Sequence, residues 1–157
     1  MLRRSERSRV VFTMGPLLAP VDDVFRDVTP MAGGSVTWTE YYREATIPWQ
    51  FLSRECQEFL ERIPLLNRLV RQYGAPMHVI VATDPRGIVR EPTEIRWPGY
   101  VDVRLKRILV EDDGTGDSER VGEVQLRERG RLHAPVTVDL DEFVFALRLL
   151  GRPYAQR

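Results

Sequence analysis

The chain has 157 residues, 43% of them hydrophobic and 29% charged, a length and composition typical of one globular domain with a full hydrophobic core. Lysine and arginine together number 23, as do aspartate and glutamate, so the net charge is zero and a broad basic surface for nucleic acid is not expected. The single cysteine excludes an internal disulfide and a cysteine-based zinc site.

Only one of the 23 basic residues, Lys106, is a lysine. This bias is the codon usage expected of a high-GC bacterium; the alternative is that many arginines bind carboxylate or phosphate through their planar guanidinium groups. No apolar run is long enough to span a membrane. The basic N-terminus resembles an export signal, but Gly15 and Pro16 interrupt its apolar run and no cleavage site follows. We therefore expect a bacterial protein located in the cytoplasm.

The first 43 residues predict two strands and little helix. Residues 1–8 are polar and basic and predict a flexible arm, and residues 9–18 predict a first strand. Residues 22–28 predict one or two helical turns, followed by a loop over 29–34. Aromatic and β-branched residues predict a second strand over 35–43.

An apolar stripe at helical spacing runs from Pro48 to Gly74 and predicts one long amphipathic helix. Pro48 suits a first helical position, and Gly74 suits a helix end. Pro64 lies inside the pattern, where proline removes a backbone hydrogen bond and clashes with the preceding turn. We expect a kink or a break between Ile63 and Pro64. Cys56 lies on the stripe and is interpreted as a small buried hydrophobe.

Two strands are predicted after this helix. Residues 77–83 are apolar at both odd and even positions, which predicts a central strand covered on both sides. Residues 88–95 contain Pro92, which cannot donate a hydrogen bond to a neighbouring strand. This segment therefore predicts an edge strand.

A hairpin is predicted from strands over 100–111 and 120–129, joined by the polar, glycine-rich loop 112–118. The apolar alternation of the first strand changes phase midway, which predicts a β-bulge near Lys106 and Arg107.

The C-terminal region predicts a short strand over 133–138 and a final helix. Asp139 is placed to cap this helix, with Glu142 three residues later as in a capping box, and Gly151 is placed to end it. Residues 152–157 predict a flexible tail.

These elements predict a single α+β domain over residues 1–157. Its mostly antiparallel sheet would carry the long helix, kinked at Pro64, and the C-terminal helix packed on one face.

No motif of a catalytic, nucleotide or metal site is present. The loop 112–118 resembles part of a calcium loop but lacks glycine at the sixth position, so we interpret it as a solvated hairpin loop. His78 and His133 are not at the spacing of metal ligands. We expect neither a metal nor a cofactor.

Glu40 and His78 are the candidate catalytic residues. Glu40 falls between Trp38 and Tyr42 on the apolar side of its strand, so it must be paired with an arginine, protonated, or exposed on a binding surface. Of these we favour the arginine pair. His78 lies in an apolar strand and is interpreted as a hydrogen-bonded core histidine, with a general base as the alternative.

Aromatic and arginine side chains are the candidates for a binding surface, because both types are enriched at protein interfaces. The candidate binding residues are Trp38, Glu40, Tyr42, Arg104 and Arg127. Most of the aromatic residues over 38–49 are expected in the core. The arginines over 104–131 alternate with acids, which favours cross-strand ion pairs over nucleic-acid binding.

The sequence therefore predicts a non-enzymatic bacterial protein that acts through protein–protein contacts, for example as an immunity or antitoxin protein. Its partner would be another protein or a second copy of the chain, and a small-molecule ligand is left open. The alternative is a small enzyme or ligand-binding protein with a pocket between the long helix and the sheet, using Glu40 and His78. Nucleic acid and membrane are not expected as partners.

Overall fold

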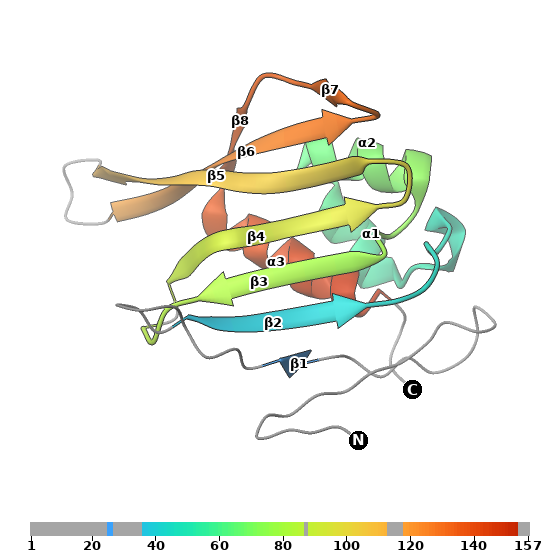
Figure 1. Ribbon diagram of the computed structural model, residues 1–157, viewed down its shortest axis with the longest axis horizontal. Helices are drawn as coiled ribbons and strands as arrows, with labels where there is room; N and C mark the ends of the chain where they lie inside the picture. The colour runs from blue at the N-terminus through green and yellow to red at the C-terminus, as the bar shows by residue number, and fades with distance from the viewer. Residues whose placement is uncertain (1–24, 27–35, 87, 113–117, 154–157) are drawn as a thin grey trace.

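The computed structural model describes residues 25–26, 36–86, 88–112 and 118–153 (Figure 1). The strands are β1 (Phe25–Arg26), β2 (Thr37–Tyr42), β3 (His78–Thr83), β4 (Val89–Trp97), β5 (Val101–Asp112), β6 (Ser118–Glu128), β7 (Arg131–Leu132) and β8 (Val136–Asp139). They form one antiparallel sheet in the order β1-β2-β3-β4-β5-β6-β7, and β8 pairs with another part of β6. The expected α+β class is confirmed.

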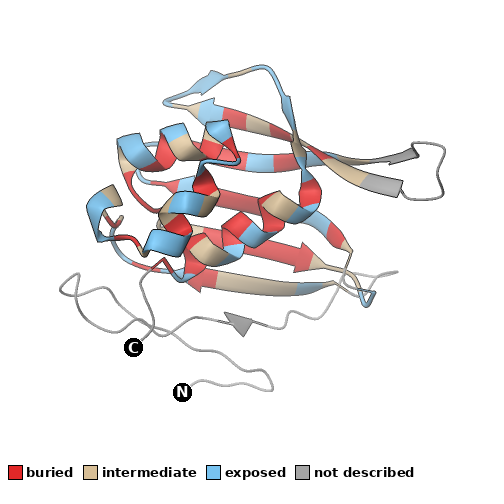
Figure 2. Cartoon of the chain, turned by 180° about the vertical axis from the view of Figure 1, so that it is seen from behind, coloured by how far each residue is buried: buried red, intermediate tan, exposed pale blue. Residues whose placement is uncertain are grey.

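The helices are α1 (Arg54–Leu60), α2 (Pro64–Tyr73) and α3 (Leu140–Gly151), and a 3-10 turn, Trp49–Phe51, precedes α1. All three lie on the same face of the sheet, as the view from behind shows (Figure 2). The architecture has two layers, as the sequence predicted. No helix in the described ranges has the length and apolarity needed to cross a membrane.

The expected single long helix is wrong, although the break at Pro64 is confirmed. Ser53 is extended, and its side chain accepts a hydrogen bond from the backbone N–H of Cys56, so α1 begins only after it. Ile63 is also extended, with φ of −126° and ψ of 90°, and Pro64 occupies the first turn of α2. The apolar stripe therefore belongs to two helices, because α1 begins only after Ser53 and α2 begins separately at Pro64.

The segment that contains Pro92 is not at an edge of the sheet, contrary to the prediction. β4 lies between β3 and β5, but only residues 94–97 pair with β5. Pro92 falls where the register with β3 is also irregular, between Ile80 and Ala82. The proline is tolerated because it lies in this interruption of the pairing.

The other expectations have mixed outcomes. The bulge is confirmed, since the β5–β6 register shifts between Leu105 and Arg107. Helical turns were predicted over 22–28, but residues 25–26 form strand β1 instead. The other residues of this segment, and all of residues 1–24, lie outside the described residues. The cap at Asp139 is confirmed, because its Oδ1 accepts a hydrogen bond from the N–H of Glu142 at 2.9 Å.

The chain is held in place beyond α3, where a flexible tail was expected to begin. Pro153 is buried, and its carbonyl oxygen accepts a hydrogen bond from the backbone N–H of Ser53. The first residues after α3 are therefore anchored at the start of α1.

The core fills the space between the helices and one face of the sheet. Its strand residues include Tyr41, Val79, Val81, Ile95, Trp97, Val103, Leu105 and Val124, and its helix residues include Cys56, Leu60, Leu66, Leu69, Phe143 and Leu147. We call this side of the sheet the covered face.

One charged side chain, Arg43, is fully buried at the end of β2. Its guanidinium donates hydrogen bonds to the carbonyl oxygens of Leu150 at 3.0 Å and Gly151 at 2.8 Å, and to that of Pro76. Leu150 and Gly151 belong to the last turn of α3, whose carbonyls lack partners within the helix. A cation is also favoured there by the helix dipole. Arg43 therefore joins the end of β2 to the end of α3.

Candidate functional site

The second face of the sheet carries the polar side chains. Tyr41 and Val79 belong to the core, so their neighbours Glu40, Tyr42 and His78 lie on the other side, because successive side chains of a strand alternate. None of the described helices covers this side (Figures 1 and 2). We call it the open face.

The register shows which side chains of the open face are neighbours, since directly paired residues lie on the same side of an antiparallel sheet. One row across β2 to β6 holds Tyr42, His78, Arg96, Asp102 and Arg127. The adjacent row holds Glu40, Ile80, Glu94, Arg104 and Gln125. Acidic and basic groups alternate along β4 and β5, and they alternate across β4 to β6 in the first row, where Asp102 lies between Arg96 and Arg127.

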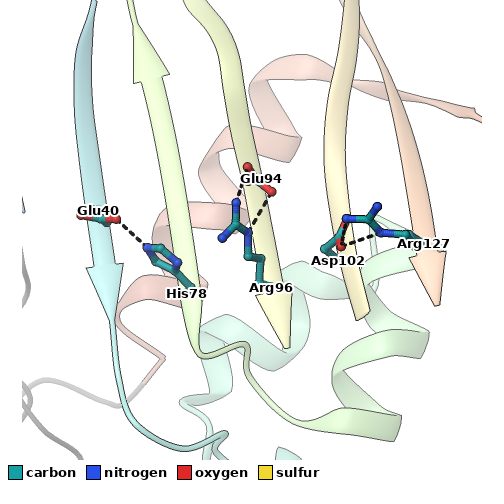
Figure 3. Close-up of polar contacts among 6 residues, drawn as sticks. All are labelled: Glu40, His78, Glu94, Arg96, Asp102 and Arg127. Carbon is teal, nitrogen blue, oxygen red and sulfur yellow. Dashed lines mark hydrogen bonds and ion pairs between the residues drawn. The ribbon is translucent and has the colours of Figure 1, made fainter. Parts of the chain in front are cut away.

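The first contact in this array joins Glu40 to His78. The Oε2 atom of Glu40 lies 2.7 Å from Nε2 of His78, across the β2–β3 pair (Figure 3). The ring of Tyr42 meets the imidazole edge-to-face, with centroids 5.6 Å apart. The described partner of Glu40 is therefore a histidine, and the arginine pair expected for it stays a prediction.

Two arginine–carboxylate contacts continue the array (Figure 3). Nε and Nη2 of Arg96 each lie 3.0 Å from a carboxylate oxygen of Glu94 on the same strand. Nε and Nη2 of Arg127 lie 3.1 and 3.0 Å from Oδ2 of Asp102, on the neighbouring strand. The expected cross-strand pairing of arginines with acids is confirmed at this second contact.

Arg96 lies among several carboxylates. The hydrogen bonds to Glu94 raise the pKa of Arg96 above its ordinary value, and the negative charges of Glu94, Asp102 and Glu40 raise it further. Burial acts in the opposite direction and is outweighed. The guanidinium is therefore the point at which the acidic groups of three strands converge.

The acids lie deeper than the bases. The Glu94 side chain is 5% exposed while that of Arg96 is 51% exposed. The Asp102 side chain is 12% exposed while that of Arg127 is 50% exposed. Arg104 is exposed and makes no hydrogen bond or ion pair within the part of the chain that the structure describes. The outer layer of the array is thus made of guanidinium groups supported from below by carboxylates.

All five candidate binding residues lie on the open face, on β2 and on the neighbouring strands β5 and β6. Trp38 and Tyr42 lie on β2 with Glu40, Arg104 lies on β5 and Arg127 on β6. The indole N–H of Trp38 is buried without an acceptor among the described residues.

Sequence reasoning missed Glu94 and Arg96. Glu94 lies in the segment 88–95, which was assigned to an edge strand, and Arg96 follows directly after that segment. Their spacing of two residues on a strand was the signal available, because it puts both side chains on one face. Placing that strand in the middle of the sheet required its pairing partners, which a single sequence does not give.

The structure also corrects the geometry of the alternative prediction. Glu40 and His78 lie on the face away from the helices, so they do not line a pocket between helix and sheet. Cys56 is buried in the core, and burial raises the pKa of its thiol to about 12, so it is a thiol at neutral pH. Within the described ranges, no cluster of three His, Cys, Asp or Glu side chains is arranged to hold a metal ion.

Searches with this chain find no matching family model, no matching curated protein and no matching solved structure.

Proposed function

We propose that the protein is a non-enzymatic binding protein that holds a partner protein on the open face of its sheet. The observation that carries this proposal is the array of ion-paired side chains that crosses β2 to β6 opposite the helices. Its composition supports protein recognition, because arginine and tyrosine are among the residues enriched at protein interfaces.

The order within the array also favours binding over a merely solvated surface. A surface arginine usually moves among many rotamers, and holding it still on binding costs free energy. Here Arg96 and Arg127 are each fixed by two hydrogen bonds to a carboxylate below. Tyr42 is exposed but stacked edge-to-face on His78. A partner would therefore meet a surface whose anchors are already oriented.

The proposal is tested by finding the partner and mapping where it binds. The tagged protein is used to purify partners from cells of the organism that encodes it, beside the variants Arg104→Glu and Tyr42→Ala. The matched control is Arg148→Glu, which makes the same charge change at an exposed position of α3. Amide hydrogen exchange of the purified complex then reports which strands the partner protects.

We expect one partner to be retained by the wild type and the control, to be lost from both open-face variants, and to slow exchange in β2 to β6. A partner that binds all four proteins equally and protects only α1 and α3 would contradict the proposal.

A further inference from the structure

The partner segment held on the open face is acidic: we infer a polypeptide stretch whose carboxylates accept hydrogen bonds from Arg96, Arg104 and Arg127. This inference rests on the proposed function and adds the chemistry of the partner. The inference depends on how deeply each charged group is buried. The number of charges does not decide it, because the array has similar numbers of acids and arginines.

The acids of the array are already occupied. Glu94, Asp102 and Glu40 each accept at least one hydrogen bond from a side chain of the same face. Glu94 and Asp102 are also the less exposed members of their pairs with arginine, at 5% and 12%. A basic partner would have to reach past the guanidinium groups to contact them.

The guanidinium groups, in contrast, have donors to spare. A guanidinium has about five N–H donors, and Arg96 and Arg127 each use two nitrogens, Nε and Nη2, on their carboxylates. Arg104 uses none within the described part of the chain. The outer surface of the array therefore offers hydrogen-bond donors and positive charge, which an acceptor with negative charge complements.

The positions of the three arginines suit a peptide. They occupy consecutive strands β4, β5 and β6, and neighbouring strands lie about 5 Å apart. Arg96 and Arg127 share a row, and Arg104 is in the adjacent row. Alternate residues of an extended peptide lie about 7 Å apart on one side. Carboxylates at this spacing could therefore each reach an arginine on a different, neighbouring strand.

The same depth argument disfavours nucleic acid. Polyanion binding requires an excess of positive charge to displace condensed counterions. The array has carboxylates beneath its arginines, and the whole chain has a net charge of zero. Isolated carboxylates, each carrying one charge, match single guanidinium forks without needing a continuous positive field.

The test uses a fluorescein-labelled octapeptide in which glutamate alternates with serine, and a matched peptide in which glutamine replaces glutamate. Binding to the full chain is measured by fluorescence anisotropy at about 50 and 300 mM salt, a range over which surface electrostatics are increasingly screened. The variants are Arg104→Gln on the open face and Arg148→Gln as the control on α3. Arg104→Gln removes no described contact, so it leaves the fold intact, which circular dichroism checks.

We expect the glutamate peptide to bind, the glutamine peptide to bind at least roughly tenfold more weakly, and Arg104→Gln to weaken the glutamate peptide by roughly tenfold. Arg148→Gln should leave the affinity unchanged, and the higher salt should weaken binding. Equal affinity for the two peptides, or no effect of Arg104→Gln, would overturn the inference.

Two further outcomes would also overturn it. The first is tighter binding of a single-stranded oligothymidylate probe than of the glutamate peptide. The second is concentration-dependent self-association of the unlabelled protein in sedimentation velocity that Arg104→Gln abolishes, since the occupant would then be a second copy of the chain. If a cellular partner protects β2 to β6 but the glutamate peptide fails, the proposed function stands and only the acidic chemistry is wrong.

Discussion

The two faces of this sheet are built from the same strands, and they handle charge in opposite ways. On the side of the helices, the guanidinium of Arg43 is fully buried and its described hydrogen bonds go to backbone carbonyls. On the open face, arginines are half exposed and bind carboxylates. Burial makes a charge costly unless its partners are fixed, whereas an exposed ion pair contributes little to stability. We therefore expect stability to depend on one face and recognition on the other.

The largest expected difference between the faces is between two arginines. Replacing Arg43 with alanine removes the groups that satisfy the last carbonyls of α3 and leaves a cavity in the core, so we expect a loss of about 3–5 kcal/mol in the free energy of unfolding. Arg104→Ala on the open face, which removes no described contact, should cost less than about 1 kcal/mol. Urea unfolding of both variants measures this difference. Comparable losses would contradict the expectation that stability depends mainly on the covered face.

A core truncation should show the same division with apolar side chains. Leu147 is fully buried on α3, and Leu147→Ala should cost about 2–5 kcal/mol. Tyr42→Ala on the open face should cost much less, because Tyr42 is exposed. Phe59 is only partly buried against the core, so Phe59→Ala should cost less than Leu147→Ala. Thermal and urea unfolding rank the three variants, and a Tyr42→Ala loss equal to that of Leu147→Ala would contradict this order.

Glu40→Gln distinguishes the observed histidine contact from the arginine pair that the sequence favoured. The amide can still hydrogen-bond to the imidazole of His78, and the contact lies on the open face, so we expect a change of less than about 1 kcal/mol. Urea unfolding near neutral pH makes the measurement. A loss of several kcal/mol would indicate a structural ion pair at Glu40 and would weaken the assignment of the open face to recognition.

The smallest expected effect is at the junction of the two layers, where the hydroxyl of Tyr73 on α2 donates a hydrogen bond to Glu128 at the end of β6. This bond lowers the pKa of Glu128 below its ordinary value of 4.5, and the charge of Arg68 acts in the same direction. A lowered carboxyl pKa contributes stability above the unfolded pKa and loses it as the pH falls through the folded value.

Tyr73→Phe should therefore remove part of the decrease in stability between neutral pH and about pH 3. Urea unfolding at several pH values compares the variant with the wild type. Identical pH dependence in the two proteins would show that the bond to Glu128 does not contribute.

The features that could be predicted from sequence depend on residues that are close together in the chain. The bulge near Lys106 followed from a change in the phase of alternation, and the cap at Asp139 followed from a spacing of three residues to Glu142. Trp38, Glu40 and Tyr42 share one side of β2, as strand alternation predicts, but this side is the open face and not the covered one.

The features that were missed depend on contacts between distant segments. The start of α1 depended on the competition between Pro48 and Ser53 as start signals, which the apolar stripe hides. Arg43 appeared only as the last residue of a strand, and its partners lie 107 and 108 residues further along the chain. Arg96 became part of the array only through the pairing of β4 with both neighbours.

The contact of Arg43 with the end of α3 has a consequence for motion. The last turn of a helix ordinarily frays, opening and closing at little cost. Here, opening that turn would strip acceptors from a buried guanidinium, so the cost of local opening approaches that of releasing β2 from the core. The amides of the last turn of α3 should therefore exchange with solvent as slowly as those of the central strands, although they lie in the final turn of a helix.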